Sequence, residues 1–289
     1  MSKGFIHHSF SPVAVPVLFA KNPDGGLWVC IDYWYINRKM IKNQDPLPLL
    51  QEKLNLLWKA WIYTMLDVEG ATDLRRVKEG EEYNLASWTG YCLFEPRVVL
   101  FGTNNAPTCS QRYIINAIRE ALDDFTSAYL DDILIYSDSE EAHEEYVKWV
   151  MKQLLEAGLY LKPEKCEFHM ETVRYLRLNI STKGISMDED KVETVWNWSC
   201  EKKTKNGRLS NLFEVLQFLG CCNYYRCFIH EYSEKAELLT GLRKKDERFV
   251  WEAEQQLAFE WIVEAFTMAL VLWHLDHERE EIIETDDSD

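Results

Sequence analysis

The sequence predicts an α+β fold, and three patterns point to it. Short apolar runs rich in β-branched and aromatic residues are typical of strands, and they occur within residues 13–20, 27–31, 61–66 and 129–136. Stretches with helical spacing of apolar residues lie between these runs. The last third of the chain has mainly helical periodicity. We therefore expect strands and helices together in the first two thirds of the chain, followed by a helical region.

The first half of the chain begins with a predicted hairpin. Residues 11–32 hold two apolar runs around the turn-forming segment 22–26. Residues 49–60 combine helical spacing of leucines with a charged face, so we expect a helix that leads into the strand ending at Asp67. Pro107 suits the first turn of a helix that runs to about Leu122.

The second half starts with a helix that Ser139 is expected to cap and that ends near Gly158. Residues 159–181 return to strand patterns. Further helices are predicted over residues 188–198, 210–231 and 252–270.

Composition describes a folded protein, because 47% of the residues are hydrophobic and 13% are aromatic. No apolar run approaches the roughly 18 residues that span a bilayer, and no signal-peptide layout begins the chain. Eight cysteines show no paired C-x-x-C spacing. We therefore expect reduced thiols in an intracellular protein, cytoplasmic or nuclear, without a membrane partner.

The net charge of −16 weighs against nucleic-acid binding, because phosphate neutralisation by basic side chains supplies most non-specific affinity. The charge is unevenly distributed: residues 1–65 carry seven basic and four acidic side chains. Residues 66–289 hold the acidic excess. A local basic channel is compatible with this distribution.

Two adjacent acids, Asp131 and Asp132, lie between two strand-like runs and are predicted to form the two-residue turn of a hairpin. Neighbouring carboxylates repel unless a cation lies between them. A hard cation such as Mg²⁺ binds carboxylate oxygens and keeps positions open for phosphates. Asp67, at the end of another strand-like run, is the candidate third acid. The alternative interpretation is a solvated turn, since Asp is common in turns.

A series of motifs in a fixed order resembles the polymerase segment of reverse transcriptases from gypsy-class long-terminal-repeat retrotransposons. The resemblance runs from Ser11 to Asp289, nearly the whole chain. The matching motifs are Cys30-Ile31-Asp32-Tyr33, Asp45-Pro46-Leu47-Pro48, Leu66-Asp67, Phe101-Gly102, Asn105-Ala106-Pro107, Gln111-Arg112, Tyr129-Leu130-Asp131-Asp132, Lys165-Cys166-Glu167-Phe168-His169 and Phe218-Leu219-Gly220.

The resemblance implies a right-hand polymerase fold with three parts: fingers and palm over 11–181, a helical thumb over 182–245, and a connecting helix with a truncated RNase H-like start over 246–289. The palm is expected to be an antiparallel sheet with helices packed on one face. It implies an RNA-directed DNA polymerase that uses two Mg²⁺ ions, with Mn²⁺ as a substitute. The implied partners are an RNA or DNA template with its primer and a dNTP, and the implied location is a cytoplasmic virus-like particle or the nucleus.

The resemblance also assigns roles to individual residues. Asp67, Asp131 and Asp132 are the implied catalytic acids and metal ligands, with Asp67 and Asp131 as the principal ligands of both ions. Asp73, Asp123 and Asp124 match no motif and are expected to be surface charges. The implied nucleotide-binding residues are Lys21, Thr72, Phe101 and Gly102. The implied primer or template contacts are Tyr129, Arg112, Leu176 and Arg177. Gln111 and Arg112 are expected to support the acidic hairpin from beneath.

Several positions depart from the family pattern. Trp28 and Trp34 replace arginines that bind the triphosphate, so two guanidinium groups become indoles with one donor each. Thr72 replaces an aromatic ring that excludes a 2′-hydroxyl, and Ser110 replaces a core phenylalanine, which predicts a cavity. Arg177 replaces a turn glycine, which predicts strain if φ is positive there.

Three interpretations follow from these observations. The first is a working RNA-directed DNA polymerase, and the second is a folded, catalytically dead relative that keeps at most weak nucleic-acid binding. The third is an unrelated acidic globular protein. Arg-to-Trp changes at 28, 34 and 88 each need one C-to-T or G-to-A transition, which favours a copy that decays without selection. We accordingly expect very weak or undetectable polymerisation by this chain.

Overall fold

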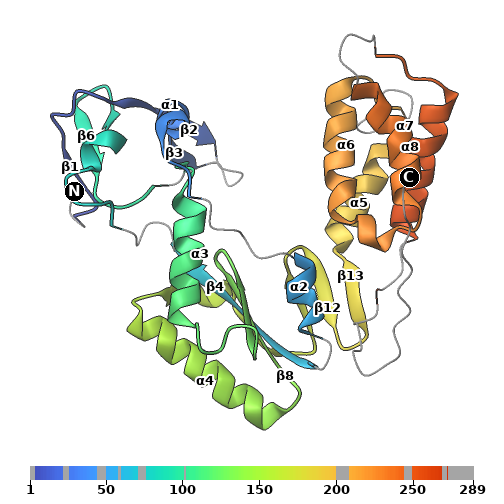
Figure 1. The fold of residues 1–289 in the computed structure, drawn as a ribbon, viewed down its shortest axis with the longest axis horizontal. Coiled ribbons are helices and arrows are strands. Elements are labelled where there is room, and N and C mark those ends of the chain that lie inside the picture. Colours follow the sequence, from blue (N-terminus) through green and yellow to red (C-terminus); the bar gives the residue numbers. More distant parts are fainter. Residues whose placement is uncertain are drawn as a thin grey trace, which may run out of the picture. The chain divides into compact units, whose positions relative to one another are not determined.

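The computed structural model describes residues 4–21, 26–43, 50–57, 60–70, 76–100, 102–199, 208–243, 249–268 and 272. The chain divides into two compact units, Met1–Met170 and Glu171–Asp289. Both units combine strands and helices, which confirms the predicted α+β class (Figure 1). Within these described residues, no helix is long and apolar enough to cross a membrane.

The first unit begins with a five-stranded sheet whose strand order is β1-β6-β5-β2-β3. The predicted hairpin within 11–32 is confirmed, because β2 and β3 pair antiparallel with Phe19 opposite Val29. Strands β2 and β5 are the parallel pair in this sheet. A short helix, α1 (Trp34–Lys39), follows the hairpin. The strands are β1 (Ile6–His8), β2 (Val15–Lys21), β3 (Leu27–Ile31), β5 (Ser87–Trp88) and β6 (Leu93–Pro96).

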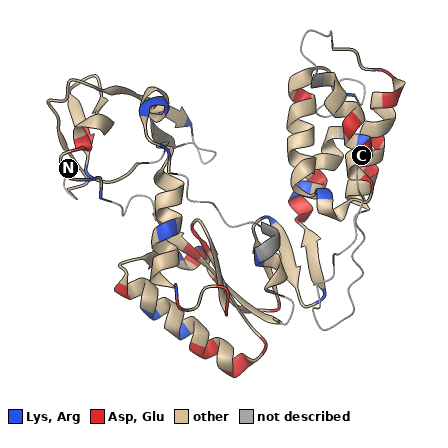
Figure 2. Ribbon diagram, in the orientation of Figure 1, with Lys and Arg blue, Asp and Glu red and all other residues tan. Residues whose placement is uncertain are grey.

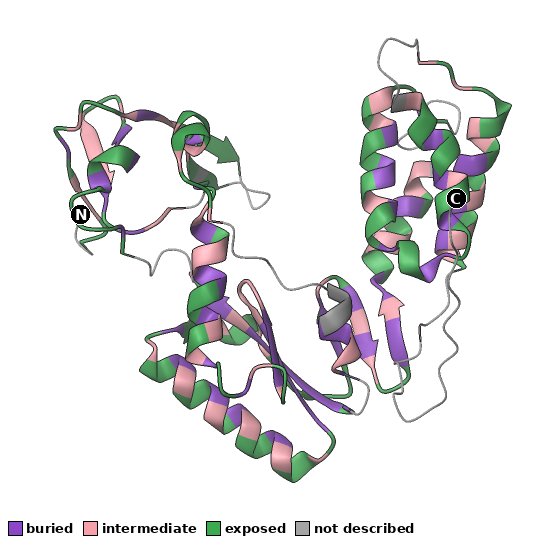
Figure 3. Ribbon diagram, in the orientation of Figure 1, coloured by how far each residue is buried: buried purple, intermediate pink, exposed green. Residues whose placement is uncertain are grey.

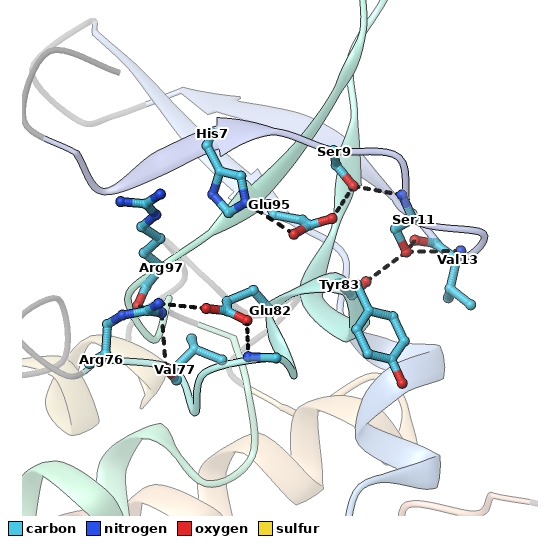
Figure 4. Close-up of polar contacts among 11 residues, drawn as sticks. His7, Ser9, Ser11, Val13, Arg76, Val77, Glu82, Tyr83, Glu95 and Arg97 are labelled. Atoms are coloured by element: carbon cyan, nitrogen blue, oxygen red, sulfur yellow. Dashed lines mark hydrogen bonds and ion pairs between the residues drawn. The ribbon is translucent and has the colours of Figure 1, made fainter.

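Carboxylates hold the segments around this sheet together (Figure 4). Glu95 accepts a hydrogen bond from the Ser9 hydroxyl at 2.5 Å and lies 3.2 Å from the His7 Nε2. Glu82, in the 3₁₀ helix η1 (Glu82–Leu85), accepts from Arg76 at 2.5 Å and from the backbone N–H of Gly80 at 2.6 Å. The backbone N–H of Glu82 itself, together with these hydrogen bonds, lowers the pKa of Glu82 to about 2.

The second sheet of the first unit is antiparallel and has the strand order β10-β4-β8-β7. Strand β4 lies centrally, and a short strand, β9, pairs with its far end. The strands are β4 (Ile62–Glu69), β7 (Thr126–Tyr129), β8 (Asp132–Ser137), β9 (Tyr160–Leu161) and β10 (Glu167–Met170).

Helices α3 (Ala106–Ala117) and α4 (Glu140–Glu156) cover one face of this sheet, as predicted. Their buried side chains form one core with residues of alternate strand positions (Figure 3). Full burial of each such aliphatic side chain contributes roughly 1.5–3 kcal/mol. The core residues are Leu66, Val68, Ile114, Ile118, Ala128, Ile133, Ile135, Val147, Val150, Leu154 and Leu159. Acidic residues recur along the opposite, exposed side of α4 (Figure 2).

Two details of the predicted helices were wrong. Helix α3 ends at Ala117, before Leu122, because residues 118–125 turn back into β7 through Asp123, whose φ is +66°. Ser139 occupies the N-cap position of α4, but its side chain makes no capping hydrogen bond. The Ser139 carbonyl instead accepts the Ser137 hydroxyl at 3.0 Å.

One imidazole is fully buried where α4 meets the sheet. His143 is 0% exposed, and its two ring nitrogens lie 2.7 Å from the Thr64 hydroxyl and 2.9 Å from the Ser137 hydroxyl. The edge of the His169 ring packs against it, with the ring centroids 4.9 Å apart. Burial lowers the pKa of His143 to about 4, and the charge of His169 acts in the same direction. The neutral imidazole therefore joins β4, β8 and α4 through one polar network.

The second unit consists of a three-stranded antiparallel sheet and four longer helices. The helices share an aromatic core in which Phe218 and Phe259 lie 4.8 Å apart between ring centroids. Leu272 forms a backbone bridge with Ile185. The elements are β11 (Thr172–Tyr175), β12 (Leu178–Ser181), β13 (Gly184–Met187), α5 (Glu189–Ser199), α6 (Leu212–Tyr224), α7 (Tyr232–Thr240) and α8 (Ala253–Thr267).

The single helix predicted over 210–231 was wrong, because α6 ends at Tyr224. A 3₁₀ turn, Arg226–Phe228, follows, and Glu231 adopts a φ of +55° before α7 begins. Helical periodicity continues across this break because Tyr225, Phe228 and Tyr232 are all buried. Apolar spacing alone therefore did not reveal the change of direction.

Candidate active site

Three neighbouring strands place polar side chains in one row at the end of the central sheet. Asp67 on β4 lies directly opposite Asp132 on β8, and Asp132 lies directly opposite Tyr129 on β7. Residues opposite each other in antiparallel strands project to the same face. Since Leu66 and Ile133 point into the core under α3 and α4, Asp67 and Asp132 project from the other face.

Asp131 lies beside this row in the turn of the hairpin. The turn was predicted at Asp131-Asp132, which was wrong: its two residues are Leu130 and Asp131, and Asp132 is the first residue of β8. Pairing with Asp67 extends β8 by that one residue. The backbone carbonyl of Asp131 accepts the N–H of Val68 at 2.9 Å. The three acids are thus brought together from segments about 65 residues apart in sequence.

Gln111 of α3 holds the hairpin tip in position. Its amide donates to the Ala128 carbonyl at 3.1 Å, and its side-chain oxygen accepts the backbone N–H of Leu130. Leu130 has a φ of +54°, a left-handed conformation that costs a non-glycine residue roughly 1–2 kcal/mol. The predicted support from Gln111 is confirmed, whereas Arg112 beside it is exposed.

Two lysines that sequence analysis did not single out lie against Asp67. The Lys162 Nζ is 2.9 Å from Asp67 Oδ1, and the Lys165 Nζ is 3.6 Å from Asp67 Oδ2. The hydrogen bond to Asp67 raises the pKa of Lys162. Both lysines border η2 (Pro163–Lys165), which follows β9. Lys165 is the first residue of one of the family motifs, and Lys162 lies three residues before that motif. No other sequence pattern pointed to these two lysines.

The pKa of Asp132 reflects its burial and the two neighbouring carboxylates. Burial raises its pKa to about 6, and the charges of Asp67 and Asp131 add to that effect. Lys165 and Lys162 act in the opposite direction. At Asp132, burial and the two neighbouring carboxylates therefore outweigh the effect of the two lysines.

These acids suit a hard divalent cation by their chemistry. Carboxylate oxygens are the ligands that Mg²⁺ prefers, and a cation would relieve the repulsion that raises the pKa of Asp132. Across the residues that the structure describes, no three Asp, Glu, His or Cys side chains already converge as a metal-ligand set. Lys162 and Lys165 occupy the Asp67 side of the site instead.

A pocket of about 360 Å³ adjoins Asp131. It lies between the hairpin turn and the first turns of α3, and Gly102 is part of its wall. Gly102 has a φ of +98°, and its carbonyl accepts the Asn37 side chain at 2.7 Å. The lining residues are Gly102, Thr103, Asn104, Ala106, Pro107, Ser110, Leu130 and Asp131.

The other predicted site residues have varied locations. Lys21 is exposed at the end of β2, and Leu176 and Arg177 belong to the second unit. Asp124 is exposed, as predicted, and Asp123 is exposed but pairs with the buried Lys53 at 2.5 Å. Several predicted positions lie outside the described residues: Thr72, Asp73, Phe101 and the side chain of Trp28.

Two of the departures from the family pattern are visible in the structure. Trp34 is 69% exposed, and the Arg38 guanidinium carbon lies 4.4 Å from the centre of its ring. Leu176 and Arg177 form the turn between β11 and β12 with φ values of +51° and +60°. Arg177 therefore has the positive φ at which strain was expected. Tyr225 donates a hydrogen bond to the Arg177 carbonyl at 3.0 Å and so holds this turn.

Comparison with known proteins identifies the relatives of the chain. Residues 21–180 match the family described as reverse transcriptase (RNA-dependent DNA polymerase). The Tf2-3 and Tf2-7 transposon polyproteins of Schizosaccharomyces pombe are each 35% identical to this chain over all of its 289 residues. The chain spans 21% of the length of those polyproteins.

Solved structures give a matching fold. A foamy viral protease-reverse transcriptase in complex with double-stranded DNA aligns with 96% of this chain and 48% of its own, with a TM-score of 0.83 and 20% identity. A second foamy viral protease-reverse transcriptase, in complex with an RNA/DNA hybrid, aligns with 93% of this chain and 35% of its own, with a TM-score of 0.78 and 19% identity.

Proposed function

Because the chain belongs to the reverse transcriptase (RNA-dependent DNA polymerase) family, we propose that it is the polymerase segment of a retrotransposon polyprotein. It joins a dNTP to the 3′ end of a primer on an RNA or DNA template, inside the cell, in the cytoplasm or the nucleus. The observation that carries this proposal is the pair Asp67 and Asp132, which face each other beside Asp131 at the end of the central sheet.

The three acids are the proposed ligands of two Mg²⁺ ions, for which Mn²⁺ is the substitute. Asp67 and Asp131 are the principal ligands and Asp132 is secondary. When bound, such ions stabilise the attacking and leaving oxygens of the phosphoryl transfer. Lys162 and Lys165, which now neutralise Asp67, are then free to contact a phosphate. Their position supports a site that handles both cations and polyanions.

The remaining proposed contacts come from both units. Lys21 and Gly102 contact the nucleotide, together with Thr72 and Phe101. Tyr129, in the same cross-strand row as Asp132, contacts the primer together with Arg112, Leu176 and Arg177. The proposed three-part organisation is fingers and palm over 11–181, thumb over 182–245 and connecting segment over 246–289.

A second candidate function is a folded protein without polymerase activity that binds nucleic acid weakly. The exposed indole of Trp34 favours it, because this position on α1 now has one hydrogen-bond donor instead of a guanidinium fork. Losing one charge-assisted contact costs roughly 1.5–3 kcal/mol. Loss of two such contacts, at positions 28 and 34, lowers the polymerisation rate by roughly two to four orders of magnitude.

Primer extension on an RNA template with Mg²⁺ separates the two functions. Asp131→Asn should abolish extension, because it removes a proposed metal ligand. Asp124→Asn is the matched control, since Asp124 is an exposed acid in the segment between α3 and β7 and lies outside the cross-strand row. Asp123 is unsuitable as a control because it pairs with Lys53. Equal losses in both variants would show that overall charge, and not a defined site, supports the activity.

A further inference from the structure

A pocket of about 330 Å³ is lined by side chains of α4 and of the segment that joins α3 to β7. We call it the aromatic pocket. Its lining residues are Glu120, Phe125, Glu145, Tyr146 and Trp149. The three aromatic side chains are half-buried, and the two acidic side chains are exposed. None of these lining residues is basic, so the aromatic pocket is acidic as well as aromatic.

The rings of the aromatic pocket are held in fixed positions. Phe125 stacks on Tyr146 with the ring centroids 3.9 Å apart, and Trp149 meets Phe125 edge to face at 5.8 Å. The planes of Tyr146 and Trp149 are therefore close to perpendicular. The Phe125 N–H donates to the Ala121 carbonyl at 3.2 Å, and the Phe125 carbonyl accepts the Tyr136 N–H at 3.0 Å. Because these bonds fix the backbone of Phe125, the aromatic wall is preorganised for a ligand.

The two acidic side chains of the aromatic pocket form no ion pair within the part of the chain that the structure describes. The lysines of α4 have other partners: Lys148 donates to Glu144 at 2.7 Å, and the Lys152 Nζ lies 3.9 Å from Glu156. Among the described residues, no lysine or arginine lies over a ring of this pocket either. The pocket therefore combines aromatic rings with two carboxylates whose charge no neighbouring side chain offsets.

We propose that the aromatic pocket binds a quaternary ammonium group, such as that of choline or of trimethyllysine. Aromatic rings attract a cation that lies over their faces, and quaternary ammonium groups are bound in this way in proteins. A lysine ammonium has three N–H donors and a guanidinium has five. A quaternary ammonium has no N–H that must be paired, so its methyl groups can contact the rings. The two carboxylates add attraction between opposite charges.

This proposal is independent of the polymerase function. Asp67 and Asp132 project from the sheet face that α3 and α4 leave uncovered, whereas α4 itself lines the aromatic pocket. A ligand in the aromatic pocket therefore makes no contact with the row of acids, and its binding can be measured without nucleic acid or Mg²⁺.

Ligand-observed NMR titration of the full chain with choline and with 3,3-dimethyl-1-butanol tests the proposal. The two molecules have nearly the same shape, but the alcohol has a carbon in place of the charged nitrogen. We expect choline to bind roughly three- to thirtyfold more tightly, which corresponds to one cation–ring interaction. Nα-acetyl-trimethyllysine amide and Nα-acetyl-lysine amide are titrated in parallel, and the methylated compound should bind more tightly.

Two variants examine the rings and the charge separately. Trp149→Leu keeps apolar surface but removes a ring, so it should weaken choline binding roughly three- to tenfold. Glu145→Gln should weaken it roughly two- to fourfold, as expected for one exposed carboxylate. The controls are Trp196→Leu, at an exposed tryptophan of α5, and Glu141→Gln, at an exposed acid one turn earlier on α4. Neither control should change the affinity for choline.

Equal affinities for choline and the neutral alcohol overturn the proposal, as does the absence of measurable choline binding. A choline affinity that neither Trp149→Leu nor Glu145→Gln lowers overturns it too, and so do equal losses in Glu145→Gln and Glu141→Gln. Tighter binding of choline or of trimethyllysine identifies the source of the ammonium group, and either order supports the proposal. Thermal unfolding of each variant identifies loss of folding. Glu145→Gln decides the question if Trp149→Leu does not fold, because Glu145 is exposed.

Discussion

Asp67 and Asp132 lie directly opposite each other on β4 and β8, and their side chains project from the sheet face that α3 and α4 leave uncovered. Burial of Asp132, together with the charges of Asp67 and Asp131, raises its pKa to about 6 in spite of two nearby lysines. Like charges at directly opposed positions destabilise a sheet. The pairing therefore lowers the stability of the folded chain, and a bound cation would offset that loss.

Removal of the lysine beside Asp67 should strengthen Mg²⁺ binding. Lys162 lies 2.9 Å from Asp67 Oδ1 and competes with a metal ion for that carboxylate. We expect Lys162→Met to lower the Mg²⁺ dissociation constant roughly three- to tenfold, in line with about 1 kcal/mol for a partly exposed ion pair. Calorimetric titration with Mg²⁺ in the absence of nucleic acid measures this dissociation constant. Lys148→Met is the control, because Lys148 pairs with Glu144 on the exposed side of α4; an unchanged constant in Lys162→Met would exclude this competition.

Restoring a guanidinium on α1 should increase primer extension. Trp34 is 69% exposed, so Trp34→Arg should fold normally and supply a forked donor for the triphosphate. We expect a gain of roughly ten- to a hundredfold, since each 1.4 kcal/mol is about tenfold. Adding Trp28→Arg and then Thr72→Tyr should raise the activity further. Tyr91→Arg is the control, because it adds a guanidinium at an exposed aromatic residue that is not one of the positions where tryptophan replaces arginine. Robust extension by the unmodified chain, with no gain from these changes, contradicts the importance assigned to both tryptophans.

The turn between β11 and β12 should become more stable when Arg177 is replaced by glycine. Arg177 has a φ of +60°, which is unfavourable for any residue with a Cβ atom. We expect Arg177→Gly to raise the free energy of unfolding by about 1 kcal/mol, after part of the relief is lost to the greater flexibility of the unfolded chain. Denaturant unfolding measures the difference. Arg177→Ala removes the same side chain but keeps Cβ, so it should give no gain; a similar gain in both variants would point to the arginine charge instead.

Acid should weaken the first unit through His143. Its folded-state pKa of about 4 lies below the ordinary value of 6.5, so the unfolded chain binds the proton more readily between these values. The contribution of the neutral His143 to the free energy of unfolding is complete above pH 6.5. It is lost as the pH falls towards 4, by up to the order of 3 kcal/mol. Urea unfolding at several pH values measures the slope. His143→Gln removes this titration, so its free energy of unfolding should fall less over the same window; equal slopes would contradict the assignment.

The central elements could be predicted from the sequence because their signals are local. Short apolar runs rich in β-branched and aromatic residues mark β4 and β8, and two adjacent acids between such runs mark the hairpin. The ordered motifs also identified the family, which the comparisons bear out. Gln111 was expected beneath the hairpin from the resemblance, and its hydrogen bonds to Ala128 and Leu130 confirm that expectation.

The tertiary structure alone decided where the charges and cavities of the site lie. Lys162 meets Asp67 across 95 positions of sequence, a contact that no local pattern encodes. Pairing with Asp67 draws Asp132 into β8 and leaves Leu130 and Asp131 as the turn. The buried hydroxyl of Ser110 has no hydrogen-bond partner within the part of the chain that the structure describes, and this too depends on which side chains surround it. Periodicity reports the conformation that each segment prefers, whereas burial and ion pairing arise only when distant segments pack together.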